Sequence, residues 1–252
     1  MIVSEVMTTD LVTVTPDDSL SHAANLLRQH QFHHLPVVKA VQGLKLIGQQ
    51  YTTESSWPVL EGLITSNDIE LVATLGTENS ITKDQHPWEE RRVAEVMNRS
   101  IMRVTPTTSV AAAAQMLVEL GLNCLPVVEY EEAISTEPGA KHEERTLLVG
   151  LLTRSDLLIE LARTLGAFEP GMNVLIPLHA GNPTSLAKLL LLAAELHIKI
   201  ESIVVAPPKK GVPHAATVRI GTINPAPLLV HLQQAGIPYS FADFQFEGGT
   251  HG

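Results

Sequence analysis

The stretch GLITSND at residues 62–68 decides the fold, because it recurs as GLLTRSD at residues 150–156. Further matches lie upstream in the same order, at a constant offset of 90 residues: EVM at 5–7 and 95–97, VTP at 14–16 and 104–106, and LPVV at 35–38 and 125–128. Chance does not place so many matches in one order, so they mark an internal repeat. Two copies of one structural unit therefore occupy the first two thirds of the chain.

A short strand and then a helix are predicted around the Thr-Pro step of each copy. Apolar residues after this step recur at helical spacing in both copies, which is typical of an amphipathic helix. Polar residues directly after the proline are candidates for the N-cap, namely Asp17 or Asp18 in the first copy and Thr107 or Thr108 in the second.

The Leu-Pro-Val-Val and Gly-Leu-Ile-Thr runs predict two strands, the first of them buried, since they are short and rich in β-branched residues. About twenty residues separate these strands, at 39–59 and 129–148, and we expect projecting hairpins or loops there. A second helix follows each aspartate of the repeat, and Gly76 and Gly166 are expected to end it. Each copy is thus a β-α-β-β-α unit.

The remaining third of the chain has a different pattern. Its apolar periodicity and turn residues predict a strand at 173–179, a helix at 185–196, strands at 199–206 and 215–221, a helix at 225–236 and a strand at 238–242. This β-α-β-β-α-β order is the ferredoxin-like arrangement. The predicted fold class is therefore α+β, with three domains at 1–78, 90–168 and 171–246.

Charge and cysteine content exclude several classes of function. The chain has 17 Lys and Arg against 27 Asp and Glu, a formal net charge of -10, so it lacks the positive field that nucleic acids and anionic membranes attract. Its single cysteine, Cys124, cannot form an intramolecular disulfide, which fits a reducing compartment. The most apolar stretch, 186–198, is interrupted by Lys188 and Glu195 and is too short to span a membrane. We expect a cytoplasmic protein with no membrane insertion.

The threonine and aspartate at the end of each repeated stretch carry binding chemistry. If Thr65 and Thr153 end strands, Asp68 and Asp156 lie in the first turn of the next helix, beside free backbone N–H groups. A carboxylate there can accept both hydroxyls of a ribose, and the helix end favours phosphate. Arg154 adds a cationic fork in the second copy alone. Alternatively, both aspartates simply stabilise helix N-termini.

The two copies resemble the cystathionine-β-synthase (CBS) domain, which occurs as tandem pairs that form a Bateman module. The resemblance covers residues 1 to about 168 and rests on the repeated motifs quoted above. It implies that the two copies pack through their sheets, with ligands of the adenosine type in clefts between them. The ligand would be AMP, ADP or ATP, alone or with Mg²⁺.

The resemblance also implies roles for individual residues. Asp68 and Asp156 would bind the ribose, and Thr65 and Thr153 would contact ribose or phosphate. The adenine would lie against backbone at 12–14 and 102–104, which includes Val14 and Val104, between apolar walls. The expected wall residues are Val37, Val127, Ile64 and Leu152. His33 and His34 would reach phosphates in the first copy, where the second copy has Asn123 and Cys124. Which of the two clefts these histidines serve stays open.

Histidines and the lone cysteine also permit other interpretations. His22, His30, His33 and His34 could form a metal cluster, but they lie on different predicted elements with no cysteine or carboxylate pair at ligand spacing, so we predict no metal site. Cys124 lies beside a buried-strand proline, and we expect a small core residue there rather than a nucleophile. The chain has no complete catalytic motif of the common hydrolase, metalloprotease or nucleotide-binding types.

Residues 181–186, with the sequence GNPTSL, and residues 197–202, with the sequence HIKIES, resemble the ACT domain. ACT domains are small regulatory folds that often bind amino acids. The usual loop of that family has Asp and Gly where this chain has Gly181 and Thr184, so a dimerising sheet without a ligand is the alternative. The order of two CBS repeats and an ACT-like domain resembles the acetoin-utilisation family of regulatory proteins.

These observations predict a cytoplasmic regulatory sensor without catalytic activity. It would bind an adenine nucleotide in its CBS clefts and use the ACT-like domain to form a homodimer or to bind a second small ligand, and the protein target that it regulates is unknown. Two alternatives stay open. One is a nucleotide-processing enzyme, and the other is an interaction protein with empty clefts.

Overall fold

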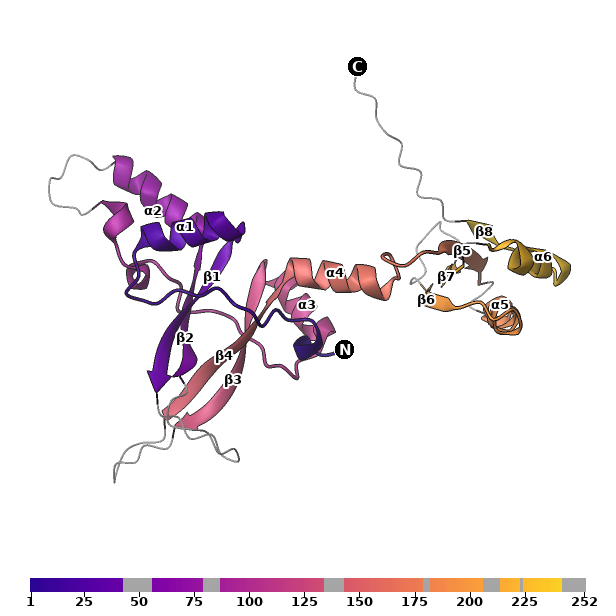
Figure 1. The fold of residues 1–252 in the computed structure, drawn as a ribbon, viewed down its shortest axis with the longest axis horizontal. Coiled ribbons are helices and arrows are strands. Elements are labelled where there is room, and N and C mark those ends of the chain that lie inside the picture. Colours follow the sequence, from indigo (N-terminus) through magenta and orange to yellow (C-terminus); the bar gives the residue numbers. More distant parts are fainter. Residues whose placement is uncertain are drawn as a thin grey trace, which may run out of the picture. The chain divides into compact units, whose positions relative to one another are not determined.

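A computed structural model gives the fold of the chain (Figure 1). It describes residues 1–42, 56–78, 87–133, 143–178, 182–205, 214–222 and 224–241. The chain divides into two compact units, Met1–Leu157 and Leu158–Gly252. This division falls inside one helix, α4 (Arg154–Thr164), so the three predicted domain boundaries stay a prediction.

The two sequence copies form one four-stranded sheet in the first unit. The elements in chain order are η1 (Val3–Glu5), α1 (Leu20–His30), β1 (His34–Gln42), β2 (Ser56–Thr65), α2 (Ser66–Glu78), η2 (Trp88–Glu90), η3 (Val93–Glu95), α3 (Val110–Glu119), β3 (Cys124–Ala133), β4 (Glu143–Thr153) and α4. The strand order is β1-β2-β4-β3, and every pairing is antiparallel. Val59 of β2 pairs with Leu147 of β4, so the two copies meet at the centre of the sheet.

The hairpin of each copy has the same register. β1 and β2 pair from His34 with Thr65 onward, and β3 and β4 pair from Cys124 with Thr153 onward. The strands of each copy extend into the segments 39–59 and 129–148, where projecting hairpins or loops were predicted. Residues 43–55 and 134–142, which contain the connections, lie outside the described residues.

The first residues of each copy pack in the core of the other copy. The Val3 N–H donates to the carbonyl of Thr108, and the Val93 N–H donates to the carbonyl of Asp18, at 2.9 and 2.8 Å. Both valines have no exposed surface. Val3 packs in the core of the second copy and Val93 in the core of the first, because η1 and η3 each lie on the partner copy. The repeats are therefore interlocked, which the sequence did not indicate.

Three local predictions were wrong: the N-caps, the short strands and the end of α2. The N-caps are Ser19 and Ser109, whose hydroxyls each accept from the backbone N–H three residues later at 3.2 Å. Asp18 instead accepts from the Thr15 N–H in the preceding turn, at 2.6 Å, so its carboxylate is already used. The short strands expected before the Thr-Pro steps are single bridges at Val14 and Val104. α2 continues beyond Gly76 to Glu78, whereas Gly166 follows α4 as expected, with a φ of +70°.

The second unit contains the remaining helices and strands that the structure describes. They are β5 (Met172–Pro177), α5 (Thr184–Glu195), β6 (Ile200–Val205), β7 (Ala215–Ile220), α6 (Ala226–Gln234) and β8 (Ser240–Phe241). The strand order is β6-β7-β5-β8 and the pairings are antiparallel. Alternate residues of β5 and β7, such as Val174 and Val218, are buried against Leu189 of α5 and Leu228 of α6. Both helices therefore cover one face of the sheet.

Within the described residues, no helix combines the length and the apolar character that crossing a membrane would require.

Candidate functional site

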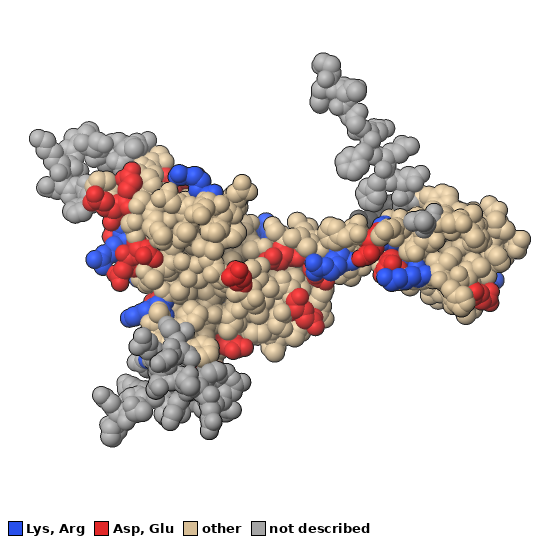
Figure 2. Space-filling model, viewed as in Figure 1, with Lys and Arg blue, Asp and Glu red and all other residues tan. Residues whose placement is uncertain are grey.

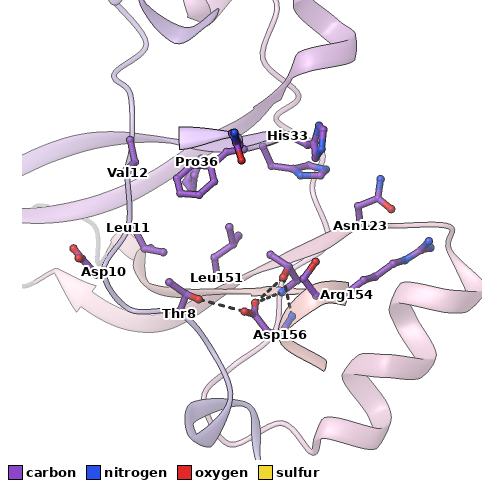
Figure 3. Close-up of a pocket in the computed structure, with 15 residues that line it drawn as sticks. Thr8, Asp10, Leu11, Val12, His33, Pro36, Asn123, Leu151, Arg154 and Asp156 are labelled. Atoms are coloured by element: carbon purple, nitrogen blue, oxygen red, sulfur yellow. Dashed lines mark hydrogen bonds between the residues drawn. The ribbon is translucent and has the colours of Figure 1, made fainter. Parts of the chain in front are cut away.

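A cleft of about 530 Å³ lies between the two copies (Figure 3). Residues from 8–12 and 31–36 of the first copy line it, together with Asn123 and residues from 151–156 of the second copy. The first segment reaches the cleft because Thr8 pairs with Leu151 in an antiparallel bridge. The cleft therefore needs both copies, and the first residues of α4 form part of its lining.

Asp156 is held in place by the threonine three residues before it. Its Oδ2 accepts from the Thr153 backbone N–H at 2.8 Å and from the Thr153 hydroxyl at 2.7 Å, while that hydroxyl accepts from the Asp156 N–H at 3.1 Å. Oδ1 receives a long hydrogen bond of 3.4 Å from the Thr8 hydroxyl (Figure 3). Oδ1 is thus the oxygen that can still accept from a ligand. The Thr153 hydroxyl proton is used internally, which argues against a direct phosphate contact by that group.

Arg154 lies at the rim of the cleft, where its position is partly fixed. One Nη2–H donates to the carbonyl of Leu117 at 3.1 Å, in the last turn of α3. A guanidinium at a helix C-terminus is favoured by the partial negative charge there. The Arg154 side chain is exposed and has further N–H groups, so it can bind an anion while keeping this contact.

Both predicted histidines line the same cleft as Asp156. The sequence had left open which of the two clefts they serve. His33 is exposed, and His34 is half-buried at the first position of β1. Burial lowers the pKa of His34, the nearby charge of His33 lowers it further, and the carboxylate of Asp68 opposes both effects. His34 therefore favours its neutral form, while His33 is the histidine more open to solvent.

The valines predicted for the adenine slot do not line the cleft. Val37 and Val127 have no exposed surface and belong to the cores of their copies, as do Ile64 and Leu152. The backbone of Val14 is also occupied, because its N–H donates to Pro36 and its carbonyl accepts from Val38. Val104 makes the same two contacts with Pro126 and Val128. The prediction placed these residues in the site because strand position alone does not show which residues border a cleft.

The apolar wall of the cleft consists of other residues: Leu11, Val12, Pro36 and Leu151. No hydrogen bond within the described residues involves the backbone N–H or carbonyl of Val12, so these groups can bind a ligand. Sequence reasoning missed Thr8, Leu11 and Leu151 as site residues. The repeated Glu-Val-Met before Thr8 was the available signal, since it marked this segment as part of the unit.

The equivalent position in the first copy has the same framework and different neighbours. Asp68 Oδ2 accepts from the Thr65 N–H at 2.9 Å and from the Thr65 hydroxyl at 2.7 Å. Asn98 takes the place of Thr8 there, and its side-chain oxygen accepts from the Ser100 N–H instead. Ser66 replaces the arginine.

Two other chemistries find no support among the residues that the structure describes. No group of three or more His, Cys, Asp or Glu side chains lies close enough to hold a metal ion in those parts of the chain. Cys124 is buried, and burial raises the pKa of its thiol to about 12, so the reactive thiolate is disfavoured at neutral pH.

The fold and the cleft define a class of protein in which two repeats form one sheet and line a cleft between them. Residues 3–49 and 93–163 match the family model of the CBS domain, which confirms the two predicted CBS repeats in this part of the chain. A curated relative, the CBS domain-containing protein YhcV of Bacillus subtilis (strain 168), is 28% identical over 132 residues, which cover 52% of this chain and 76% of that protein.

Solved structures are similar at lower identity. The candidate acetoin utilization protein AcuB of Vibrio cholerae is 22% identical, with a TM-score of 0.45, over 68% of this chain and 98% of that chain. CBSX2, determined in complex with AMP, is 22% identical, with a TM-score of 0.43, over 64% of this chain and 95% of that chain.

Proposed function

We propose that the first unit is a regulatory module that binds an adenine nucleotide, AMP, ADP or ATP, in the cleft at Asp156. One observation carries this proposal: Asp156 is fixed through Oδ2 and presents Oδ1 to a cleft that has an apolar wall on one side and a guanidinium on the other. A nucleotide has the matching order of groups, with a flat base, a ribose that donates from two hydroxyls and an anionic phosphate.

Each part of the nucleotide has a partner in this proposal. The base lies on the wall formed by Leu11 and Pro36, where burial of its faces is favourable. The ribose hydroxyls donate to Asp156 Oδ1. The phosphate lies near Arg154 and His33, and Mg²⁺ accompanies ATP if the extra charge requires it.

Binding rather than catalysis is the proposed activity. The side chains that line the cleft can accept hydrogen bonds, donate them and carry charge. The two candidate nucleophiles are not available, because Cys124 is buried outside the cleft and the Thr153 hydroxyl donates to Asp156. Incubation of the full chain with ATP or ADP, with and without Mg²⁺, should leave the nucleotide intact. Turnover that is lost in Asp156→Ala would establish the enzyme alternative.

Titration calorimetry of the full chain with AMP, ADP and ATP tests the site. Asp156→Ala removes the acceptor for the ribose hydroxyls, so affinity should fall roughly 10- to 100-fold, or about 1.5–3 kcal/mol. Asp68→Ala is the matched control, because it removes the same contacts to threonine in the other copy. It should lower stability by a similar amount and leave the tighter binding step unchanged.

Two results would contradict the assignment. If Asp156→Ala and Asp68→Ala weaken the tighter step equally, the cleft between α4 and the N-terminal segment is not the preferred site. If neither wild type nor variant binds any adenine nucleotide, the interaction-protein alternative stands.

The second unit is proposed to be an ACT-like domain that supports a homodimer or binds a second small ligand. Its β-α-β-β-α-β order and its strand order β6-β7-β5-β8 support this proposal. In the first unit, Leu71 and Leu75 of α2 are 60% and 48% exposed, and large exposed apolar side chains favour association. Native mass spectrometry of the freshly purified chain reports the number of subunits and any ligand that remains bound.

A further inference from the structure

The first copy contains a second cleft of about 530 Å³, which is separate from the cleft at Asp156. It lies between α1 and α2, which are side by side in Figure 1, and Trp88 of η2 also lines it. This volume is within the range of about 300–1,000 Å³ that is typical of small-molecule sites. The two clefts share only the lining residues Gln31, Phe32 and His33, so each can hold its own ligand.

A difference between the two copies keeps this second cleft open. Arg154 of α4 reaches α3, where its guanidinium donates to the carbonyl of Leu117 at 3.1 Å. The equivalent residues of the first copy are Ser66 and Leu27, and a serine side chain is too short to make this contact. Both Ser66 and Leu27 instead line the open space between α1 and α2.

The lining combines buried apolar side chains with two aromatic rings that solvent reaches. Leu27 and Ile69 are buried in the core of the first copy, and Trp88 is half-buried and packs against that core. Phe32 is exposed. A flat ring that binds here would remove its own faces and part of these aromatic surfaces from water, which is favourable.

The formal charges of the lining cancel, with histidine counted as neutral. Arg28 of α1 and Glu70 of α2 are both exposed, and among the described residues neither side chain makes a hydrogen bond or an ion pair. Figure 2 likewise shows acidic and basic side chains mixed on the surface over α1 and α2. A cation and a carboxylate at one cleft leave little net field to attract a charged ligand.

We propose that this cleft is a second binding site, for a small uncharged aromatic molecule that packs against Trp88, Leu27 and Ile69. The site is independent of the proposed nucleotide function, because Asp156, Arg154 and the apolar wall of the other cleft do not line it.

Benzamide, benzoate and benzylammonium test the proposal, since they share one ring and differ in charge. The chain has two tryptophans, so Trp57→Phe leaves Trp88 as the single tryptophan, and its fluorescence reports on the cleft. Benzamide should change this fluorescence with saturation, at a half-saturation of roughly 0.1–10 mM for a ligand of this size. Benzoate and benzylammonium should bind more weakly, by roughly 3-fold or more, because their charges lose hydration. Calorimetry of wild type, which needs no substitution, should give the same order.

Two variants are expected to fill the cleft. Ser66→Arg installs the residue of the second copy, whose guanidinium can reach the carbonyl of Leu27, and Ala24→Leu enlarges a lining residue. Each should lower the affinity for benzamide roughly 10-fold, because little space remains for the ring. Ala114→Leu is the matched control, since it makes the same change at the equivalent position of the second copy, and it should leave the affinity unchanged.

Several results would overturn this site. Full benzamide affinity in both Ser66→Arg and Ala24→Leu, with wild-type circular dichroism, places the ligand elsewhere. Displacement of benzamide by AMP means that benzamide occupies the cleft at Asp156. Tighter binding of benzoate or benzylammonium contradicts the uncharged class, and absence of binding by all three rejects the site. None of these results requires AMP to bind, so the proposed nucleotide function stands or falls separately.

Discussion

In both copies of the repeat, an aspartate at the start of the second helix accepts two hydrogen bonds from the threonine three residues earlier. The hydroxyl-to-carboxylate distance is 2.7 Å in each copy. The surroundings of this shared framework differ. Thr8 and Arg154 lie at Asp156, whereas Asn98 and Ser66 occupy the equivalent positions near Asp68.

The difference shows which contacts are local and which depend on the partner copy. The threonine and aspartate belong to one turn, so repetition of the sequence repeats their geometry. The rest of the cleft comes from segments that cross between copies, through the bridges of Thr8 with Leu151 and of Asn98 with Leu63. Substitutions in those crossing segments can therefore make one site differ from the other without altering the fold.

The largest expected effect on stability is at the glycines where the crossing segments touch the hairpins. A Cβ at Gly62 would lie 2.8 Å from the backbone oxygen of Asn98, whereas a Cβ at Gly150 would meet chiefly the flexible side chain of Met7, at 2.5 Å. Gly62→Ala should thus destabilise the chain by about 1–3 kcal/mol, and Gly150→Ala by less. Urea denaturation followed by circular dichroism measures both.

Gly150→Ala should nevertheless weaken nucleotide binding more than Gly62→Ala does. The added methyl group lies 3.2 Å from the backbone oxygen of Thr8, so the segment that contacts Asp156 must shift. Equal losses of affinity in calorimetry, or a larger loss in Gly62→Ala, would show that the position of Thr8 does not matter for the cleft.

A smaller effect is expected at Gln31, which directly follows α1, and at its equivalent Gly121, which lies two residues after the end of α3. Gln31 has a φ of +56° and Gly121 a φ of +66°, and this left-handed conformation is costly for a side chain with a Cβ. Gln31→Gly should stabilise the chain by about 0.5–1 kcal/mol, and Gly121→Gln should destabilise it by about 1 kcal/mol. Thermal unfolding measures both changes. The prediction requires changes of opposite sign in the free energy of unfolding for the two variants. Destabilisation by Gln31→Gly would mean that the glutamine side chain contributes more stability than its left-handed backbone conformation costs.

The sequence predicted the parts of the fold that depend on neighbouring residues. Helical spacing located α1 and α3, and the repeated Leu-Pro-Val-Val located β1 and β3. The N-caps were misplaced by one or two residues, because Asp18 competes for the turn before the helix and Ser19 takes the cap.

The candidate site was predictable only in part, for a physical reason. Thr153, Arg154 and Asp156 lie within one turn, so their proximity follows from sequence spacing. The proximity of the wall residues does not, because a one-residue step along a strand exchanges the core face for the cleft face: Val37 belongs to the core cluster and Pro36 lines the cleft. Thr8 of the first copy lies beside Asp156 of the second copy because of a long-range bridge to Leu151, and no local sequence pattern encodes this bridge.

The smallest expected effect concerns pH and compares His34 with Cys124, its equivalent in the second copy. Burial, aided by the charge of His33, lowers the pKa of His34 in the folded chain, and Asp68 only partly offsets this. The unfolded chain therefore binds a proton at higher pH than the folded chain does. Stability should be constant above the unfolded-state pKa of about 6.5 and should fall as pH decreases below it. The thiol of Cys124, with a pKa of about 12, does not titrate in this range.

Urea denaturation between pH 8 and pH 5 isolates this contribution by difference. His34→Cys installs the residue of the second copy and should flatten the decline relative to wild type. His33→Asn, likewise taken from the second copy, removes the charge that lowers the pKa of His34, so its decline should lie between those of wild type and His34→Cys. A decline in His34→Cys as steep as that of wild type would assign the pH dependence to other groups. A steeper decline would mean that protonated His34 stabilises the folded chain through Asp68, and that the carboxylate outweighs burial.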